Sequence, residues 1–279
     1  MILPITSFKW VCVSLLIFAF VACKKDMGTP TPVDTNLLVE GNAADLIPVT
    51  VQVNASFGGF YIQLPHLYKY TTKNYPILIF FHGLGQMGNG SSDLGYILQD
   101  GIGKVLNDKK FPISFDVQGK NYSFIIVSPQ TSKIPSMAEA WQFVQYIMSN
   151  YRGDPKRLYI SGLSLGSRIA TLVAAQYPDS VAALLAIAGV ALNPGFEGRC
   201  TKIANANLPV WEFHNIDDPL ANVNDAKRFI KLISDLNPPV SPRMTIFDVY
   251  GHDAWTTALN PNYKENSMNV YEWMLHYSR

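Results

Sequence analysis

The sequence predicts an α/β protein: a single domain with a mostly parallel, doubly wound sheet and helices on both faces. Two observations favour this class. Short, continuous apolar runs alternate with helical stretches along the chain, and strands buried on both faces have this unbroken apolar pattern. The segment that we expect to fold, residues 46–279, has the length of one large α/β domain and leaves no room for a second.

The first two strands are expected to form an antiparallel pair. Apolar and polar residues alternate along residues 49–54, and a second β-like segment follows at residues 58–64. Unbroken apolar strands are then expected at residues 77–81, 124–128, 158–161, 183–188, 210–213 and 245–250. Helices are expected between and after them at residues 94–107, 137–151, 167–176, 222–236 and 266–276.

Residues 1–22 read as an export signal. Lys9 precedes the apolar run 10–22, which is shorter than the roughly 18 to 20 apolar residues of a membrane-spanning helix. The residues Phe20-Val21-Ala22-Cys23 resemble a bacterial lipobox, which implies cleavage before Cys23 and lipidation of that cysteine. An uncleaved anchor and plain secretion remain alternatives.

Residues 23–45 are expected to be the lipidated cysteine followed by a flexible tether. Pro30, Pro32 and several Thr and Asn residues occur there with little periodicity, as in extended linkers. We therefore expect a protein of the bacterial cell envelope, on the periplasmic or outer-membrane surface. It would meet the membrane through the lipid anchor only.

The charge balance argues against nucleic acid as a partner, and the cysteine content argues against a disulfide. The chain has 22 Lys and Arg against 21 Asp and Glu, and removal of the signal with Lys9 makes the two counts equal, so nucleic acid is not an expected partner. With Cys12 in the signal and Cys23 lipidated, only Cys200 remains, so no intramolecular disulfide is expected. Cys200 has no histidine nearby in sequence and reads as a buried or idle thiol.

A Gly-x-Ser-x-Gly pentapeptide at residues 162–166 makes Ser164 a candidate nucleophile. It lies between a strand-like run and a helix-like run, the order in which a sharp turn exposes a serine hydroxyl beside a helix N-terminus. The small flanking glycines allow the two arms of the turn to approach each other. The amide of Leu165 is then expected to face the oxyanion that forms when Ser164 attacks a carbonyl.

Four polar clusters follow the ends of apolar strands, at residues 82–85, 162–164, 214–218 and 251–253. In a doubly wound sheet the carboxyl ends of the parallel strands meet at one edge, where reactive groups gather. We therefore expect all four clusters to lie together.

The serine needs a base, and His252 is the best candidate. In the chain order nucleophile, acid, histidine, only His252 and His276 come late enough. His276 lies in the closing amphipathic stretch among aromatic and apolar residues, which favours a packing or surface role. His252 follows the last strand in a Gly-His turn.

The acid that orients the histidine is expected in the loop after residues 210–213. Asp217, Asp218 and Asp225 are the candidates, and Asp218 is preferred because the Asp-Pro step with Pro219 favours a rigid turn. Position along the loop does not separate adjacent aspartates, so a share of the role for Asp217 stays open.

The glycine-rich loop 82–86 is the expected second contributor to the oxyanion site, through the amide of Leu84 paired with that of Leu165. His82 is expected to support this loop, and His214 to be structural. The histidines are too scattered with respect to carboxylates to indicate a metal site, and no cofactor is implied.

Several segments together resemble a known group of enzymes. They are Phe80-Phe81-His82-Gly83, Ser128-Pro129-Gln130, the segment from Asp154 to Gly166, Pro209-Val210-Trp211-Glu212-Phe213-His214, and Gly251-His252-Asp253-Ala254-Trp255-Thr256. Over about residues 46–279 they resemble the α/β-hydrolase esterases related to carbohydrate esterase family 1, the feruloyl and acetylxylan esterases, and polyhydroxybutyrate depolymerase-like lipoproteins.

The resemblance implies an α/β-hydrolase fold for the catalytic domain 46–279 and a triad of Ser164, Asp218 and His252. It implies a serine esterase that acts through an acyl-enzyme on a small ester or an acylated polysaccharide, with acetyl or feruloyl groups. Asn215 stands where relatives usually have Gly, Ser167 replaces a frequent Gly, and the loop 84–90 lacks an acidic residue that relatives often carry, so substrate preference stays open.

Two other functions remain as alternatives. A peptidase of the prolyl oligopeptidase type has the same fold and triad, although it usually carries a further gating domain. A lipid-anchored protein without catalytic activity could instead bind glycan through Trp141, Trp211 and Trp255, although each of these is expected in a packed position.

Overall fold

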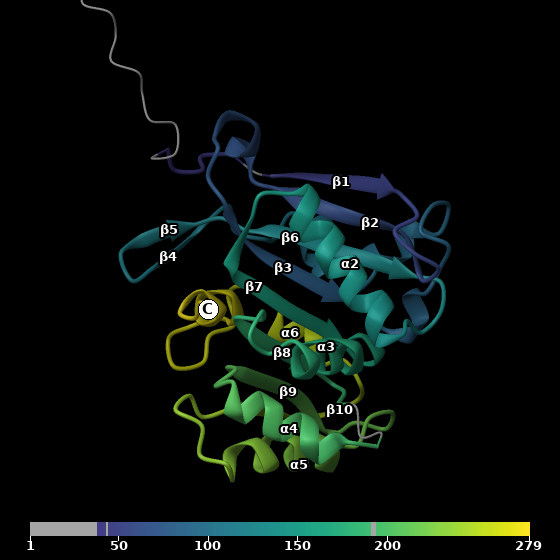
Figure 1. The fold of residues 1–279 in the computed structure, drawn as a ribbon, viewed down its shortest axis with the longest axis vertical. Coiled ribbons are helices and arrows are strands. Elements are labelled where there is room, and N and C mark those ends of the chain that lie inside the picture. Colours follow the sequence, from purple (N-terminus) through teal and green to yellow (C-terminus); the bar gives the residue numbers. More distant parts are fainter. Residues whose placement is uncertain (1–37, 43, 191–193) are drawn as a thin grey trace, which may run out of the picture. The chain divides into compact units, whose positions relative to one another are not determined.

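The computed structural model describes residues 38–42, 44–190 and 194–279 (Figure 1). The predicted signal, Cys23 and most of the predicted tether lie outside the described residues. Across the described part of the chain, no helix combines the length and apolar character needed to cross a membrane.

Within the described residues, eight strands form one sheet in the order β1-β2-β6-β3-β7-β8-β9-β10 (Figure 1). The strands are β1 (Asp45–Thr50), β2 (Phe57–Leu64), β3 (Tyr75–Phe81), β6 (Ile125–Thr131), β7 (Gly153–Leu163), β8 (Ala183–Ile187), β9 (Val210–Asp217) and β10 (Arg243–Tyr250). β1 pairs antiparallel with β2, and β2 pairs antiparallel with β6. All other neighbours in the sheet are parallel, which confirms the predicted mostly parallel sheet.

The central strands separate two apolar cores. Every residue of β3 is buried, and alternate residues face opposite sides of a strand. Ile77 and Ile79 therefore belong to one core, whereas Leu78 and Phe80 belong to the other. Because both faces of these strands are buried, successive residues are apolar, and this produces the unbroken apolar runs from which the fold class was predicted.

Helices cover both faces of the sheet. The core on one face includes residues of α2 (Met137–Asn150), α3 (Leu165–Gln176), α4 (Phe196–Asn205) and α5 (Val223–Ser234), which lie in front of the sheet in Figure 1. The core on the other face includes residues of α1 (Gly101–Asn107), α6 (Trp255–Ala258) and α7 (Val270–Leu275). This arrangement confirms the doubly wound architecture.

The single helix expected at residues 94–107 is wrong. The segment forms a 3₁₀ helix, Leu94–Leu98, and then α1, and the chain bends between them where Gly101 has a φ of +60°. A positive φ interrupts a right-handed helix, and glycine adopts it without the steric cost of a Cβ atom. At this bend, Gln99 and Asp100 line one pocket together with Leu163, the last residue of β7.

Other boundaries also differ from the predictions. β1 ends at Thr50, so the alternating residues 51–53 lie beyond it, and α7 begins only at Val270 because Asn269 caps it through the backbone N–H groups of Tyr271 and Glu272. The helix α4, the short helix α6 and the hairpin of β4 (Phe115–Val117) and β5 (Lys120–Tyr122) were not predicted.

Upstream of residue 46, Glu40 is buried and accepts a hydrogen bond from the backbone N–H of Leu67, at 2.9 Å.

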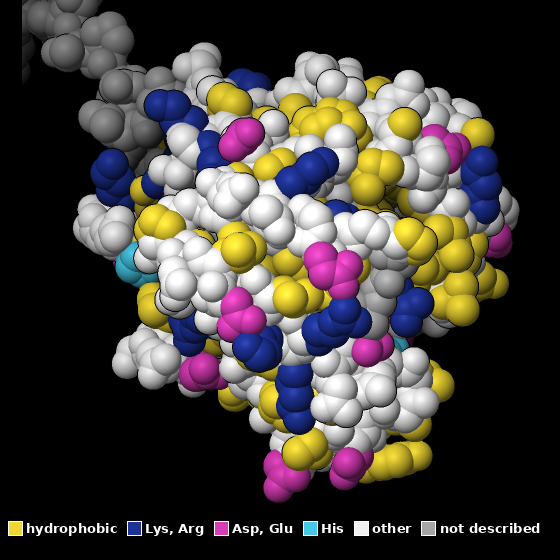
Figure 2. Space-filling view, turned by 60° about the horizontal axis from the view of Figure 1, so that its bottom comes forward, with side chains coloured by type: hydrophobic (Ala, Val, Ile, Leu, Met, Phe, Trp, Pro, Cys, Tyr) yellow, Lys and Arg dark blue, Asp and Glu magenta, His cyan; other side chains and the backbone are white. Residues whose placement is uncertain are grey.

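The register of the sheet aligns the carboxyl ends of its parallel strands. Phe81 pairs with Gly162, Leu163 with Ile187, and Tyr250 with Asp217. The four polar clusters that follow these strands therefore lie at one edge, as predicted. On the face shown in Figure 2, basic and acidic side chains are interspersed, in keeping with the balanced charge of the sequence.

Candidate active site

Ser164 lies at the sharp turn between β7 and α3. Its backbone has a φ of 52° and a ψ of −115°, a combination that costs a non-glycine residue about 1 to 3 kcal/mol. The turn is held because the backbone N–H of Ser164 donates to the carbonyl of Ile187, at 2.9 Å. The result is a serine at the start of a helix, at the edge of the sheet where the polar clusters meet.

The glycines of the pentapeptide are required by close backbone contacts. A Cβ atom on Gly166 would lie 2.0 Å from the carbonyl oxygen of Phe81, and one on Gly162 would lie 2.4 Å from the backbone of Gly166. These neighbours are backbone atoms, which cannot rotate away as a side chain could. The Gly-x-Ser-x-Gly pattern therefore reflects the tight packing of α3 against β3 and β7.

Gly166→Ala is expected to lower the free energy of unfolding by about 3 kcal/mol or more, because overpacking against backbone forces the strand and helix apart. Gly198→Ala is the matched control: Gly198 lies inside α4 with nothing within 4 Å of an added Cβ, so alanine should stabilise that helix by up to about 1 kcal/mol. Urea denaturation of both variants measures the difference. Equal effects of the two substitutions would contradict the packing argument.

Ser164, His252 and Asp218 form one hydrogen-bonded chain. Ser164 Oγ lies 2.7 Å from His252 Nε2, and His252 Nδ1 lies 2.6 Å from Asp218 Oδ2. An ionised carboxylate only accepts hydrogen bonds, so Nδ1 carries the proton and donates it to Asp218. Nε2 is then free to accept the hydroxyl proton of Ser164. The structure thus brings together the three residues that the sequence singled out.

The loop after β9 selects Asp218 over its neighbours. Asp218 Oδ1 accepts the backbone N–H groups of Leu220 at 2.8 Å and Ala221 at 3.0 Å, which leaves Oδ2 for His252. Asp217 is exposed at the end of β9, and Asp225 lies in the first turn of α5. Of the three candidate acids, Asp218 is the one that contacts His252.

Asn215, the residue that stands where glycine is usual, holds the turn that carries His252. Its Nδ2 donates to the carbonyl of Gly251 at 2.8 Å, and the N–H of Gly251 donates to the carbonyl of Asp217 at 3.2 Å. Gly251 has a φ of +116°, which glycine tolerates. Ser167, the other departure, uses its hydroxyl to accept the backbone N–H of Ile187 at 2.9 Å, which ties α3 to β8.

Leu84 and Leu165 both occupy the first position of a short helix. Leu165 begins α3, and Leu84 begins the 3₁₀ turn Leu84–Gln86. The first N–H groups of a helix or 3₁₀ turn have no carbonyl partner within it, and at Leu165 the dipole of α3 also favours negative charge. Both residues line the pocket that contains Ser164 and His252, so both predicted oxyanion donors lie at the site.

His82 and Gln86 hold the loop that carries Leu84. His82 Nε2 accepts the backbone N–H of Thr131 at 3.0 Å, so the imidazole proton is on Nδ1, which donates to the carbonyl of Gly83 at 2.6 Å. Burial lowers the pKa of His82 and keeps it neutral. Gln86 Oε1 accepts the N–H of Gly83 at 3.1 Å. His82 therefore supports the loop, as predicted.

Gln130 reinforces the same loop from β6. Its Oε1 accepts the N–H of Gly90 at 2.9 Å, and its Nε2 donates to the carbonyls of Gln86 at 3.0 Å and Asp93 at 2.8 Å. The side chain is fully buried. A buried amide that satisfies three backbone groups fixes the loop with respect to the sheet.

A buried acid and histidine lie directly behind Asp218. His214 Nδ1 is 2.9 Å from Glu212 Oε1, and His214 Nε2 is 3.0 Å from the carbonyl of Ala221 and 3.4 Å from Asp218 Oδ2. Burial raises the pKa of Glu212 to about 7, against the smaller opposing effect of His214. Burial is the largest single influence on His214 and disfavours its imidazolium. The hydrogen bond to Glu212, the carboxylate charges of Glu212 and Asp218, and the carbonyl of Ala221 together outweigh burial and raise the pKa of His214. The structural role predicted for His214 therefore has a specific partner.

This pair is expected to make stability depend on pH. The pKa of Glu212 is higher in the folded than in the unfolded chain, so the folded protein binds more protons between pH 4.5 and about 7. The contribution of Glu212 to the free energy of unfolding is complete below pH 4.5 and is lost as the pH rises through about 7. The raised pKa of His214 acts in the same direction.

Compared with Glu212→Gln, the wild-type protein should therefore lose about 2 kcal/mol of unfolding free energy between about pH 5 and pH 7.5. Urea denaturation of the two proteins across this range measures the difference. Parallel pH profiles would contradict the assignment of the titration to this pair.

The site opens into a pocket of about 590 Å³. Three apolar side chains on its lining are unusually exposed: Leu84 at 63%, Ile134 at 61% and Leu220 at 73%. Trp255 also lines it and packs edge-on against the His252 ring, with the ring centroids 5.2 Å apart. Exposed apolar residues gathered around a cavity indicate a binding surface for an apolar ligand group.

Sequence reasoning missed several residues of the site: Gln99, Asp100, Ile134, Arg168 and Leu220. None of them belongs to a motif. Arg168 lies in the first turn of α3, and the other four come from segments whose position depends on the fold. Gln130 had been noted only as part of Ser-Pro-Gln, and its place at the end of an apolar strand is the signal that could have indicated its role.

Among the described residues, no group of three or more His, Cys, Asp or Glu is placed to hold a metal ion. Cys200 is buried in α4, and burial raises its pKa to about 11, so it is a thiol at neutral pH.

Residues 76–268 match a family described by the alpha/beta hydrolase fold. The match covers more than half of the chain, so the protein belongs to the alpha/beta hydrolase family. A comparison with curated proteins found no match.

Solved structures with the same fold include a thermostable esterase, with 18% identity over 85% of this chain and a TM-score of 0.54. A ferulic acid esterase has 18% identity over 80% of this chain and a TM-score of 0.55, and 97% of its length is covered. An acylaminoacyl peptidase of Pyrococcus horikoshii has 13% identity over 76% of this chain and a TM-score of 0.51. The chain spans 64% of the thermostable esterase and 38% of the peptidase. The predicted resemblance to this group of hydrolases is confirmed at the level of the fold.

Proposed function

We propose that the protein is a serine hydrolase that cleaves carboxylic esters through an acyl-enzyme. The observation that carries this proposal is the hydrogen-bonded chain from Ser164 Oγ through His252 to Asp218, at 2.7 and 2.6 Å, set on a strained turn at the start of α3. A serine hydroxyl becomes a nucleophile when a neighbouring base accepts its proton, and this chain supplies that base and its orienting acid.

In the proposed reaction, Ser164 Oγ attacks the ester carbonyl while His252 Nε2 accepts the hydroxyl proton. Asp218 keeps the proton on Nδ1 and stabilises the imidazolium that forms. The N–H groups of Leu84 and Leu165 stabilise the oxyanion. His252 then gives its proton to the departing alcohol, and a water molecule, activated by the same histidine, attacks the acyl-enzyme and releases the acid.

The acyl group is proposed to be small or aromatic, such as acetyl or feruloyl, on a polysaccharide. The apolar pocket beside Ser164, of about 590 Å³, supports an acyl group that is bound through apolar contacts. The polysaccharide is proposed by analogy with the esterases that the sequence resembles. Turnover of acetyl and feruloyl esters of the same xylo-oligosaccharide, with Ser164→Ala as control, tests this choice.

Export and lipidation at Cys23 are proposed to place the domain 46–279 on the cell envelope, joined to the lipid by residues 23–45. The lipobox-like residues 20–23 support this proposal. Metabolic labelling with a clickable palmitate analogue tests it. Label on the wild-type protein that disappears in Cys23→Ala supports the anchor, and an unlabelled wild-type protein refutes it.

The peptidase alternative shares the fold and the same three residue types. The acylaminoacyl peptidase above is much longer than this chain, which covers 38% of it. A comparison of 4-nitrophenyl acetate with an aminoacyl 4-nitroanilide separates the two: preference for the ester supports the proposal, and preference for the anilide overturns it. If the wild-type protein turns over either substrate and Ser164→Ala does not, the non-catalytic glycan-binding alternative is excluded.

A further inference from the structure

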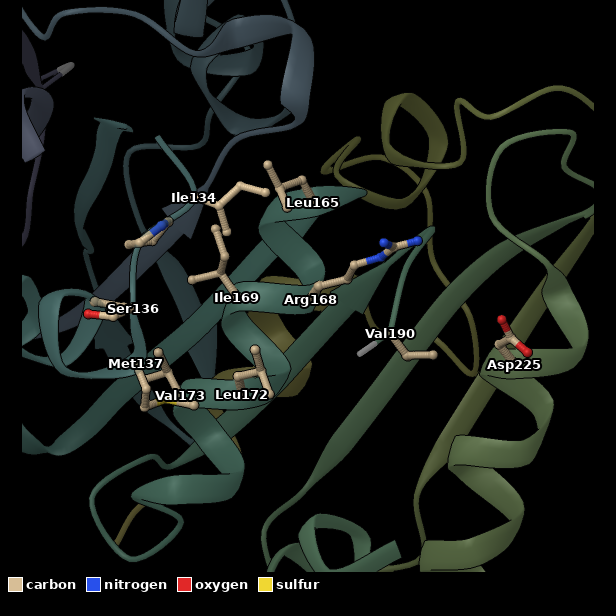
Figure 3. Close-up of a pocket in the computed structure, with 12 residues that line it drawn as sticks. Ile134, Ser136, Met137, Leu165, Arg168, Ile169, Leu172, Val173, Val190 and Asp225 are labelled. Carbon is tan, nitrogen blue, oxygen red and sulfur yellow. The ribbon is translucent and has the colours of Figure 1, made fainter. Parts of the chain in front are cut away.

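A second cavity, of about 390 Å³, adjoins the pocket of the proposed active site (Figure 3). The two share Ile134, Leu165 and Arg168 in their linings. Apart from Arg168 and Asp225, the second cavity is lined mainly by apolar side chains. They are those of Ile134, Pro135, Met137, Ala140, Leu165, Ile169, Leu172, Val173 and Val190. We refer to this cavity as the α3 groove.

One face of α3 forms the floor of the groove. Leu165, Ile169, Leu172 and Val173 are spaced by helical turns, so they lie along the same side of the helix (Figure 3). Val173 lies eight residues after Leu165, so the two are about 12 Å apart along the helix axis at the helical rise of about 1.5 Å per residue. The groove therefore begins one residue after Ser164 and runs along the helix away from it.

The two walls of the groove differ. Met137, at the start of α2, lies on one side of the α3 face in Figure 3, and Val190, after β8, lies on the other. Arg168 and Asp225 are on the side of Val190 and carry opposite charges. A groove with an apolar floor and no excess of either charge favours an uncharged, apolar occupant.

The position of His252 indicates which part of an ester enters the groove. His252, Trp255 and Leu220 line the site pocket and do not line the groove. Because the histidine protonates the departing alcohol, the alcohol lies on the His252 side of the scissile bond. The groove opens from the site through Ile134, Leu165 and Arg168, so the acyl side of the bond faces it.

We propose that the α3 groove is the acyl-binding subsite and that it accepts an extended, uncharged apolar acyl group, such as a medium-length alkanoyl or an arylalkanoyl chain. This inference rests on the proposed ester hydrolysis. It revises the acyl group proposed above: aromatic and extended acyl groups are expected to be preferred over acetyl, which is too short to leave the site pocket. Each methylene that enters the groove adds buried apolar contact in the transition state.

The test uses three esters with one leaving group: 4-nitrophenyl acetate, octanoate and 3-phenylpropanoate. Leu172→Trp and Met137→Trp fill the groove from its floor and from its wall, and neither residue lines the site pocket. Gln176→Trp is the matched control, because Gln176 is exposed at the end of the same helix and does not line the groove.

The wild-type protein should hydrolyse octanoate and 3-phenylpropanoate with kcat/KM at least about tenfold above acetate. Both groove-filling variants should lose at least about tenfold on the long esters and keep kcat/KM for acetate within about twofold, whereas Gln176→Trp should match the wild type. Retained acetate turnover also shows that the variants fold.

If both groove-filling variants kept the wild-type kcat/KM for the long esters, that result would overturn the inference. Equal losses on all three esters would also overturn it. Failure of the proposed function gives a different result: the wild type would then hydrolyse 4-nitrophenyl acetate no faster than Ser164→Ala.

Discussion

Ser164→Ala is expected to lower kcat/KM for 4-nitrophenyl acetate by about 10⁴-fold to 10⁶-fold, because it removes the atom that forms the acyl-enzyme. His252 and Asp218 then have no hydroxyl to activate, and only the oxyanion donors and the pocket remain to accelerate attack by water. The fold should be unchanged, since the Ser164 side chain bonds only to His252 among the described residues. Steady-state kinetics with a denaturation curve of the same preparation measures both.

Ser161→Ala is the matched control for this substitution. Ser161 is buried in the same strand three residues earlier, and its hydroxyl has no hydrogen-bond partner among the described residues. Removing an unpaired buried hydroxyl should leave activity within about threefold of the wild type and should not reduce stability. Full activity in Ser164→Ala, or equal losses in both variants, would contradict the assignment of the nucleophile.

Asp218→Asn is expected to lower kcat by about 10⁴-fold while the protein remains folded. An asparagine amide in place of Oδ2 would donate to His252 Nδ1, which fixes the imidazole in the tautomer whose Nε2 carries the proton. That nitrogen then cannot accept the proton of Ser164. The Oδ1 acceptor of the Leu220 and Ala221 N–H groups is retained in asparagine, so the loop keeps its shape.

Asp217→Asn, at the neighbouring residue, is the matched control for Asp218→Asn. Asp217 is exposed, and its contact to the site is through its backbone carbonyl, which accepts the N–H of Gly251 at 3.2 Å. The substitution leaves that carbonyl in place, so kcat should stay within about threefold of the wild type. Comparable losses in the two variants would mean that Asp217 shares the role of the acid.

The sheet could be predicted because its central strands are buried on both sides. The run Tyr75–Phe81 has no exposed residue, so its apolar pattern is unbroken and cannot be mistaken for a surface strand. Segments whose structure depends on partners elsewhere were predicted less well. Gly101 bends the chain between Leu98 and α1, and α4 packs through Phe196 and Cys200 against α5, contacts that have no local signature in the sequence.

The geometry of the site was predictable to the extent that it follows from chain order at one sheet edge. Ser164 and His252 each follow a parallel strand, so the topology brings them together. The choice between Asp217 and Asp218 was open, because it depends on which carboxylate the N–H groups of Leu220 and Ala221 hold. Glu212 and His214 lie two residues apart in β9 and therefore on one face of the strand, but their contact with Asp218 depends on the path of the loop after β9, which the sequence does not show.

The central claim is that Ser164 is a nucleophile activated by His252 and Asp218, and covalent labelling tests it most directly. A fluorophosphonate probe reacts with an activated serine hydroxyl and does not require knowledge of the natural substrate. We expect one adduct per folded protein, located by mass spectrometry on the peptide that contains Ser164, and no adduct in His252→Ala or in the heat-denatured protein. A folded wild-type protein in which Ser164 stays unlabelled would contradict the account.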